Sequence, residues 1–458
     1  MHVCIFPILF ARGRWSHDSR MASFDHAHDA IPTVSSVLND GTLVELLYDH
    51  MARTTALAVR QPDGATSVQA TLTLATGERL VPYSPRNGLI ASRTVLLPSD
   101  IGDFRDKRDL AEAVRAFIHR YVDLSPAFEE IATYYVLLTW VYDAFGELPY
   151  LRFRGDWGTG KTRALLTVGS LCYKPFFASG ASTTSPIFHI LDTFGGTLVL
   201  DEADLRFSDS TAELTKILNN GTVAGLPVLR TMTTRARELD PRAFHVFGPK
   251  LLGMREQFAD RALESRFLTE ETGQRPLRSD ISISLPAERH AEALALRNQL
   301  LAWRFHARHE VKADPSKLIA GIAPRLNQTA SSLLSLIDDV QVQARVADML
   351  VSEDARLGGE RASSAEFTVL SALVALTDRT PNRPIPLGDI ADLLSRKILG
   401  SAEDSFSRKA VGYVVRVKLR LPTVKSSGVF VVPALARPAI DALATRYGIT
   451  RERYAPET

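Results

Sequence analysis

One stretch of the chain combines the residue types that bind the phosphates of a nucleotide. It runs Gly155-Asp-Trp-Gly-Thr-Gly-Lys-Thr162 and follows a short apolar segment. A phosphate chain needs several inward-pointing N–H donors, and glycine tolerates best the tight loop that supplies them. Lys161 would reach the β- and γ-phosphates, and the Thr162 hydroxyl would complete a Mg²⁺ shell. The alternative is a glycine-rich surface turn. We expect ATP to be bound by Gly155, Gly158, Thr159, Gly160, Lys161 and Thr162.

A second stretch, Gly195-Gly-Thr-Leu-Val-Leu-Asp-Glu202, is an apolar strand that ends in two acids. Asp201 would hold Mg²⁺, directly or through water, and Glu202 would polarise the attacking water. Either acid alone would more often be a solvated loop residue. The letters Asp201-Glu-Ala-Asp204 also spell the DEAD-box motif, but the other motifs of those RNA helicases are missing, so the coincidence carries no information.

The order of elements around these stretches indicates the fold. Strand, loop, helix (162–170), strand (173–178), helix (185–194) and strand (197–200) follow one another. Such alternation predicts a parallel α/β sheet with its ligand at the carboxyl ends of the strands. We also expect a buried strand at 243–250, with Lys250 near the γ-phosphate.

Two arginine-bearing segments follow the acids. In Asp260–Phe267, Arg266 would reach the γ-phosphate of a neighbouring subunit and stabilise transition-state charge, and Arg261 is the second candidate for this role. The alternative is that the arginine forms an ordinary surface salt bridge. Residues 219–237 suggest a projecting β-hairpin that either grips nucleic-acid backbone or is a solvated loop. Its candidate contacts are Arg230, Arg235 and Arg237.

The last ninety or so residues have the pattern of a winged helix. Helices are expected at 367–376, 387–397 and 406–418, followed by a hairpin that turns at 426–428. Between residues 383 and 425 there are nine Lys and Arg against four Asp and Glu. Such local basic charge is typical of a DNA-binding domain, although many winged helices bind protein instead. The expected DNA contacts are Arg408, Lys409, Arg416, Lys418 and Lys425.

The remaining chain divides by its patterning. Residues 1–20 lack periodicity, and we expect them to be unstructured or to precede a true start at Met21. We expect a β-rich module at 21–124, an ATPase core at 125–272, a helical lid at 273–362 and the winged helix at 363–458. Within the lid, residues 286–362 show helical patterns at 291–306 and 326–346. Within the core, a helix from Ser125 should be buried, since it is apolar nearly all round.

Composition excludes several classes of protein. The 458 residues carry a net charge of +2, with 45% hydrophobic and 23% charged residues, as in an ordinary globular protein. Two cysteines cannot form a disulfide framework, which suits a reducing cytoplasm. No Cys and His cluster has zinc spacing. The longest apolar stretch, 131–145, is too short to span a bilayer.

Three motifs together resemble the AAA+ ATPases: Gly155–Thr162, Thr197–Glu202 and Ser265-Arg266-Phe267. The short distance from loop to acids is similar to the superfamily 3 and phage/plasmid primase-helicase branch of mobile elements, and the Ser-Arg-Phe triplet is similar to the arginine finger of minichromosome-maintenance helicases and clamp loaders. Two features depart from the branch: Gly248-Pro-Lys250 stands where a polar sensor is usual, and no paired-acid primase site is present.

The sequence and this resemblance together predict an α/β, AAA+-type ATPase with helical lid, β-rich N-terminal module and C-terminal winged helix. The expected function is an ATP- and Mg²⁺-dependent DNA motor, a helicase or translocase that works as a homo-oligomeric ring in mobile-element replication. The alternatives are a nucleotide-switched DNA-binding regulator or loader without unwinding activity, and a remodeller of protein partners.

Overall fold

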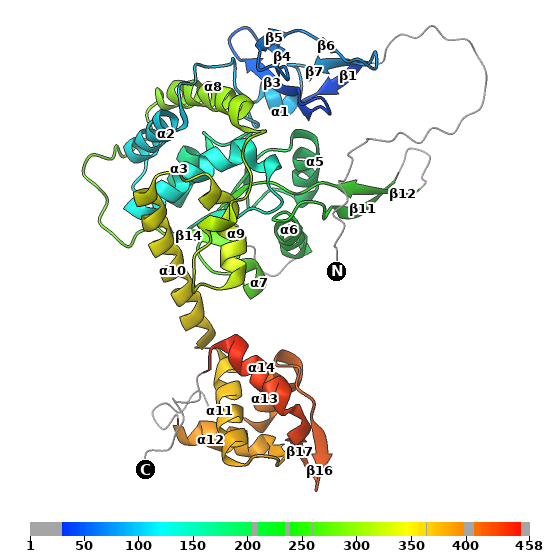
Figure 1. The fold of residues 1–458 in the computed structure, drawn as a ribbon, viewed down its shortest axis with the longest axis vertical. Helices are drawn as coiled ribbons and strands as arrows, with labels where there is room; N and C mark the ends of the chain where they lie inside the picture. Colours follow the sequence, from blue (N-terminus) through cyan, green and yellow to red (C-terminus); the bar gives the residue numbers. More distant parts are fainter. Residues whose placement is uncertain are drawn as a thin grey trace, which may run out of the picture.

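A parallel sheet of five strands lies at the centre of the protein (Figure 1). The structure is a computed structural model that describes residues 30–203, 209–233, 239–258, 260–362, 364–397 and 407–449. The predicted mixed α/β fold with a parallel sheet is confirmed. Four of these strands are almost wholly buried, as expected for apolar segments covered on both faces, and one edge strand is less buried. In sheet order they are β14 (Phe267–Glu271), β8 (Tyr150–Arg154), β13 (Lys250–Met254), β10 (Leu198–Asp201) and β9 (Phe176–Ser179).

Helices pack against this sheet. The predicted buried helix is α3 (Pro126–Val141), in which every residue from Phe128 onward is buried. Ser125 caps it by accepting a hydrogen bond from the Phe128 N–H at 3.3 Å. The other helices along this part of the chain are α4 (Lys161–Gly169), α5 (Thr184–Phe194), α6 (Asp209–Asn220) and α7 (Arg261–Glu264).

The prediction of one buried strand at 243–250 is wrong. Its first residues belong to β12 (Leu239–Phe244), which pairs in antiparallel fashion with β11 (Val228–Thr233). The sheet strand β13 begins only at Lys250, because Gly248 has a φ of 153° and Pro249 has no N–H to donate. The predicted hairpin is therefore β11–β12, which projects from the body in Figure 1, and its residues 234–238 lie outside the described residues.

Lys250 consequently stands at the amino end of its strand, at the edge of the sheet opposite the loop. Its Nζ donates to the Val246 and Gly248 carbonyl oxygens at 2.8 and 2.9 Å. Burial lowers the pKa of Lys250 to about 7. The expectation that Lys250 faces the γ-phosphate is wrong.

Short strands dominate the described chain before α2 (Lys107–Tyr121). An antiparallel sheet contains β2 (Ser35–Val37), β3 (Leu43–Asp49), β4 (Thr54–Arg60) and β5 (Thr66–Gln69). A second sheet and a helical turn contain β1 (Ala30–Thr33), β7 (Arg79–Pro82), β6 (Leu72–Thr73) and α1 (Gly88–Ala91). Glu45 of β3 is buried and connects this sheet to later parts of the chain. It accepts hydrogen bonds from the Tyr173 hydroxyl at 2.6 Å and from Arg304 Nε at 2.7 Å.

Helices account for most of residues 286–362. They are α8 (Arg289–Ala307), α9 (Pro324–Ser335) and α10 (Val340–Ala362). Of these, α8 packs against α2. The single helix expected at 326–346 is two helices. Asp339 causes the break, because its carboxylate accepts the Gln341 and Val342 N–H groups and starts α10. None of the described helices is long and apolar enough to cross a membrane.

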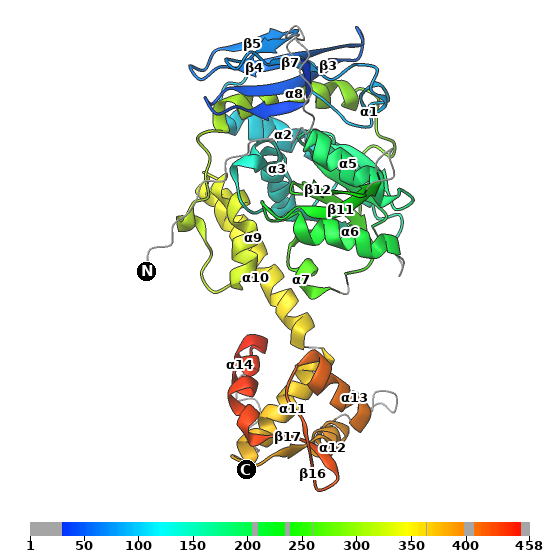
Figure 2. The ribbon, with the colours of Figure 1, turned by 90° about the vertical axis from the view of Figure 1, so that its right-hand side faces the viewer.

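A separate apolar core holds the C-terminal unit, residues 364–397 and 407–449, which lies at the far end of α10 (Figure 2). The expected helices and hairpin are present, and the third helix ends in a π-helical turn at Val414–Lys418. Ser427 and Gly428 form the predicted turn with φ of 48° and 85°. The elements are α11 (Ala365–Arg379), β15 (Ile385–Pro386), α12 (Leu387–Lys397), α13 (Arg408–Tyr413), β16 (Val424–Ser426), β17 (Val429–Val432) and α14 (Arg437–Tyr447).

Candidate nucleotide-binding site

The glycine-rich loop joins the carboxyl end of β8 to the start of α4, as predicted. Gly158 and Gly160 have φ of 77° and 92°, where a side chain would strain the backbone. A Cβ on Gly155 would stand 2.4 Å from Thr272 Oγ1, so no larger residue fits there. Three of the predicted ATP-binding positions therefore favour glycine, two because of their positive φ and one because a side chain would clash with Thr272.

Lys161 is the first residue of α4, and its side chain turns back across the loop. Its Nζ donates to the Gly155 carbonyl oxygen at 2.8 Å and also to that of Asp156. No side chain caps the amino end of α4, and no acid lies in its first turn. The amino end of α4 and the Lys161 ammonium thus lie together at the loop, an arrangement that suits an anion.

Thr162 and Asp201 meet although they come from separate parts of the chain. Thr162 Oγ1 donates to Asp201 Oδ2 at 2.6 Å. The strand β13 separates β10 from β8, and Gly253 of β13 provides the room. A Cβ at Gly253 would lie 2.8 Å from Asp201 Oδ1 and 2.8 Å from Leu165 Cδ1. The sequence did not identify Gly253, because strand pairing alone brings it to the site.

This hydroxyl and carboxylate pair suits a magnesium ion. Mg²⁺ prefers oxygen ligands and commonly takes one or two protein oxygens together with substrate phosphates and water. The described residues contain no group of three or more His, Cys, Asp or Glu side chains that could hold a metal by themselves. Thr162 and Asp201 would thus be the protein's share of a shell that the phosphates complete.

Glu202 follows Asp201 in a conformation that is rare outside glycine, with a φ of 54°. Its N–H donates to Asp201 Oδ1 at 2.9 Å, and its side chain is exposed. Gly180 allows this turn to pack closely, since a Cβ there would stand 2.4 Å from the Glu202 carbonyl oxygen. Such strain costs about 1–3 kcal/mol and often marks a functional position.

A cleft of about 420 Å³ adjoins the loop. The loop residues Gly158, Thr159 and Gly160 form one wall, and residues 270–277 form another. Thr159 Oγ1 lies 2.8 Å from Thr272 Oγ1 and so ties the two walls together. Thr272 gave no sequence signal, because it reaches the loop only through the pairing of β14 with β8.

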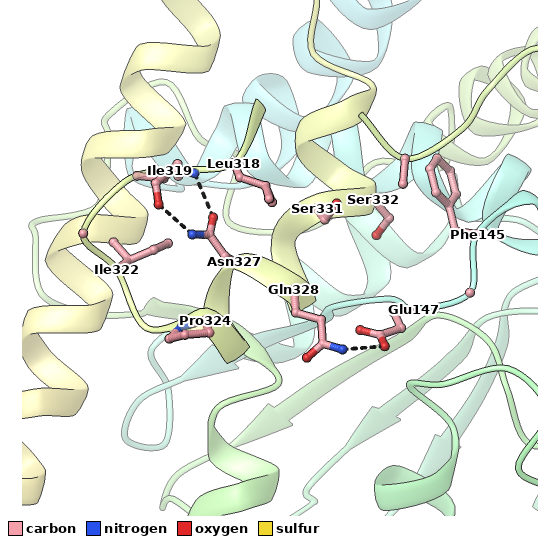
Figure 3. A pocket seen from close by; sticks show the side chains of 13 residues that line it. Phe145, Glu147, Leu318, Ile319, Ile322, Pro324, Asn327, Gln328, Ser331 and Ser332 are labelled. Carbon is pink, nitrogen blue, oxygen red and sulfur yellow. Dashed lines mark hydrogen bonds between the residues drawn. The ribbon is translucent and has the colours of Figure 1, made fainter. Parts of the chain in front are cut away.

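A larger cavity of about 600 Å³ lies elsewhere, between α9 and the residues that precede β8 (Figure 3). Its rim carries a hydrogen bond from Gln328 Nε2 to Glu147 Oε1 at 2.7 Å. Because Glu147 comes before the amino end of β8, this cavity lies away from the glycine-rich loop. Of these two, it is the smaller cleft that adjoins the glycine-rich loop.

Arg266 is half-buried within its own chain. Its Nη1 donates to the Asn219 carbonyl oxygen at 2.7 Å and to Asn219 Oδ1 at 2.6 Å, at the carboxyl end of α6. Burial lowers the pKa of Arg266 from its usual value. Arg261 begins α7, and its side chain lies outside the described residues. A role for either arginine at a neighbouring subunit stays a prediction.

The hairpin arginines are differently placed. Arg230 forms an ion pair with Glu213 of α6 at 2.8 Å. Its Cζ lies 4.6 Å from the centre of the Phe188 ring of α5, so its side chain packs against these two helices. Arg235 and Arg237 lie outside the described residues. Arg242 stands opposite Arg230 in the register and is exposed. It forms an ion pair with Asp240 at 2.9 Å. The sequence analysis does not single out Arg242, because the hairpin it predicts at 219–237 ends before this residue.

All five basic residues predicted to contact DNA in the C-terminal unit are exposed. Two of them form long ion pairs, at 4.0 Å from Arg408 to Asp392 and at 3.9 Å from Lys418 to Glu366. Because these side chains are solvent-exposed, such pairs are weak and leave the residues accessible to a partner. The five are Arg408, Lys409, Arg416, Lys418 and Lys425.

Comparisons with known proteins give similarities at the level of solved structures. No protein-family model and no curated protein matches the chain. The C-terminal region of NrS-1 is 11% identical and covers 85% of this chain and 96% of its own, with a TM-score of 0.34. SCCmec type IV Cch, titled an active helicase, is 12% identical over 90% of this chain and 96% of its own, with a TM-score of 0.35. JCV helicase is 17% identical over 58% and 65%, with a TM-score of 0.25. At these scores the likeness is loose and carries no argument about function.

Proposed function

We propose that this chain is an ATP-hydrolysing, DNA-binding motor of the AAA+ type, a helicase or translocase that serves replication of a mobile element. The observation that carries the proposal is the 2.6 Å hydrogen bond between Thr162 and Asp201 beside the glycine-rich loop. It brings together, from α4 and β10, two oxygen donors that would suit a nucleotide-bound Mg²⁺.

Each residue at this edge of the sheet has a distinct role in the proposal. The loop N–H groups and Lys161 would bind the phosphates, and Thr162 and Asp201 would hold Mg²⁺, which neutralises charge on them. Glu202 would orient and polarise the attacking water. Because its side chain is exposed and directly follows Asp201, water can reach it without a rearrangement of the strand.

Arg266 would complete the site of a neighbouring subunit in a ring of identical chains. To do so it would exchange its bonds to Asn219 for the γ-phosphate across the boundary. The effect of such an arginine is roughly 10³–10⁵ in rate. Arg266→Ala should therefore abolish hydrolysis by the assembly, and adding a Glu202→Gln subunit that keeps Arg266 should restore part of it.

DNA contact is assigned to the β11–β12 hairpin and to the C-terminal unit, which we propose to be a winged helix. Its helices, its hairpin turn and its exposed basic side chains support this assignment. Loss of DNA affinity on Arg408→Ala and Lys409→Ala would support DNA as the partner, and unchanged affinity would favour the remodeller of protein partners.

Strand displacement on a forked DNA tests the motor directly. The full chain should unwind the fork with ATP and Mg²⁺, and Glu202→Gln should bind the fork without unwinding it. Sedimentation with and without a non-hydrolysable ATP analogue tests the ring. ATP hydrolysis without unwinding or translocation would remove the motor and keep the ATPase.

The second candidate is a nucleotide-switched DNA-binding regulator or loader. One observation favours it: the C-terminal unit has its own apolar core and lies at the far end of α10, away from the sheet (Figure 2). This candidate predicts sequence-specific binding that survives Glu202→Gln. Footprinting on the DNA that flanks the gene for this chain separates the two candidates, since a motor should show no preferred sequence.

A further inference from the structure

An arginine and a phenylalanine contact each other on the surface of the C-terminal unit. Arg416 Cζ lies 5.3 Å from the centre of the Phe430 ring, and that ring is 51% exposed. Arg416 comes from the π-helical turn after α13, and Phe430 comes from β17. A Cβ on Gly412 would lie 2.9 Å from Arg416 Nη2, so the glycine allows the guanidinium to lie close against the helix.

Positive charge and aromatic surface continue around this pair. Lys425 of β16 stands opposite Phe430 in the antiparallel register, so both side chains belong to one face of the hairpin. Tyr413, the last residue of α13, is 53% exposed. Among the described residues, neither Arg416 nor Lys425 forms an ion pair with a carboxylate. The surface is therefore cationic and aromatic at once.

A purely structural role for Phe430 accounts poorly for its exposure. Val431 and Val432, the next residues of β17, are 3% and 1% exposed and belong to the core of the unit. They already anchor the hairpin, and a phenylalanine that served only to pack would be expected inside. An exposed ring held beside a guanidinium and an ammonium fits a flat, negatively charged partner better.

Nucleic acids with unpaired bases have that chemistry. Aromatic rings and guanidinium planes stack on unpaired bases, while lysine and arginine contact the phosphates. We infer that Phe430 and Arg416 form a stacking site for an unpaired base of DNA, next to the duplex that the basic residues of α13 hold. Lys425 contacts the adjoining phosphate. The inference rests on the proposed DNA binding and adds that this unit binds the junction between duplex and single strand.

The test uses the full chain and a duplex with a short single-stranded tail that carries 2-aminopurine. Binding should change the fluorescence of the 2-aminopurine base nearest the duplex. Phe430→Ala should abolish that change and weaken binding to the tailed duplex roughly five- to 150-fold. Phe430→Trp should retain both, and affinity for a blunt duplex should stay the same in all three proteins.

Val429→Ala is the matched control, because Val429 is 50% exposed but points to the other face of the hairpin. It should leave the fluorescence and the affinity unchanged. Phe430→Leu, which retains apolar bulk, should lose the fluorescence change while keeping the melting temperature of wild type, so that loss of stacking is told apart from loss of folding.

Three results would overturn the inference. They are equal effects of Phe430→Ala and Val429→Ala, equal affinity for tailed and blunt DNA, and a preference for a tailed RNA of the same sequence that Phe430→Ala does not alter. If wild type binds no DNA at all, the proposed DNA partner fails as well. If it binds DNA but Phe430→Ala changes nothing, only the stacking site fails.

Discussion

The two edges of the central sheet each hold a lysine that donates to backbone carbonyls, and the two have opposite consequences. At the carboxyl edge, Lys161 crosses an open loop beside Thr162, Asp201 and Glu202. At the amino edge, Lys250 is fully buried, and within the described part of the chain its Nζ contacts carbonyl oxygens without a carboxylate. Strand direction, more than residue type, decides which lysine is available to a ligand.

The two lysines differ in burial: Lys250 is 0% exposed, and Lys161 is only partly buried. Removal from water lowers the pKa of Lys250 to about 7, so its amino group is only partly protonated near pH 7. Lys161 lies on a loop that opens to a cleft of about 420 Å³. The carboxyl edge therefore suits an anionic ligand, whereas at the amino edge the lysine holds a turn together.

The largest expected effect at the carboxyl edge is that of Glu202→Gln. Removal of a general base should lower kcat for ATP roughly 10²- to 10⁴-fold, while ATP affinity stays within about twofold. Steady-state hydrolysis and ATP binding measure the two quantities. Glu147→Gln is the control at the other edge, where glutamine can still accept the hydrogen bond from Gln328. Equal loss in both variants would contradict the assignment.

Lys161→Ala should come next. Loss of a charge-assisted hydrogen bond to phosphate should weaken ATP binding roughly tenfold to 100-fold. Calorimetric titration with ATP and Mg²⁺ measures it. Lys250→Met sharpens the comparison, since it removes the other lysine and should leave ATP affinity unchanged. If the two variants bind ATP alike, the distinction between the edges is wrong.

A smaller effect is expected from Thr162→Ala. Without the hydroxyl, the Mg²⁺ concentration for half-maximal hydrolysis should rise roughly fivefold to tenfold, since one weak ligand of the shell is lost. Thr162→Ser retains the hydroxyl and should behave as wild type. A magnesium titration of the hydrolysis rate decides it, and an unchanged midpoint in Thr162→Ala would remove Thr162 from the metal shell.

The smallest effect concerns stability at the amino edge. Lys250 has a lower pKa folded than unfolded, so between about pH 7 and 10 the unfolded chain binds more protons, and stability rises with pH. Urea unfolding at pH 7 and pH 9 should show this rise in wild type and a smaller one in Lys250→Met. Burial also lowers the pKa of Lys174, to about 8, so part of the rise should remain. An identical rise in both proteins would contradict the assignment.

The site was predictable from sequence where its parts are contiguous. The glycine-rich loop and the paired acids each lie within one short segment whose spacing follows from the chemistry of phosphate and metal. Gly253, Thr272 and Arg242 were not predictable in that way, because strand pairing brings them into place. Residues 243–250 show the opposite failure. Their apolar pattern resembles one strand, but the Gly248-Pro249 break divides it.

The fold was predictable to a similar depth. Periodicity located α3, α8 and the helices of the C-terminal unit to within a few residues. It joined α9 and α10 into one helix, because the cap at Asp339 interrupts a pattern that otherwise continues. The partner of Arg266 at Asn219 could not be foreseen, since that contact depends on how α6 ends beside β14.

The rate of ATP hydrolysis by the full chain, with and without single-stranded and duplex DNA, tests the central claim most directly. The account predicts Mg²⁺-dependent hydrolysis that DNA stimulates and that Glu202→Gln abolishes. Hydrolysis no faster than that of Glu202→Gln under every condition would contradict it.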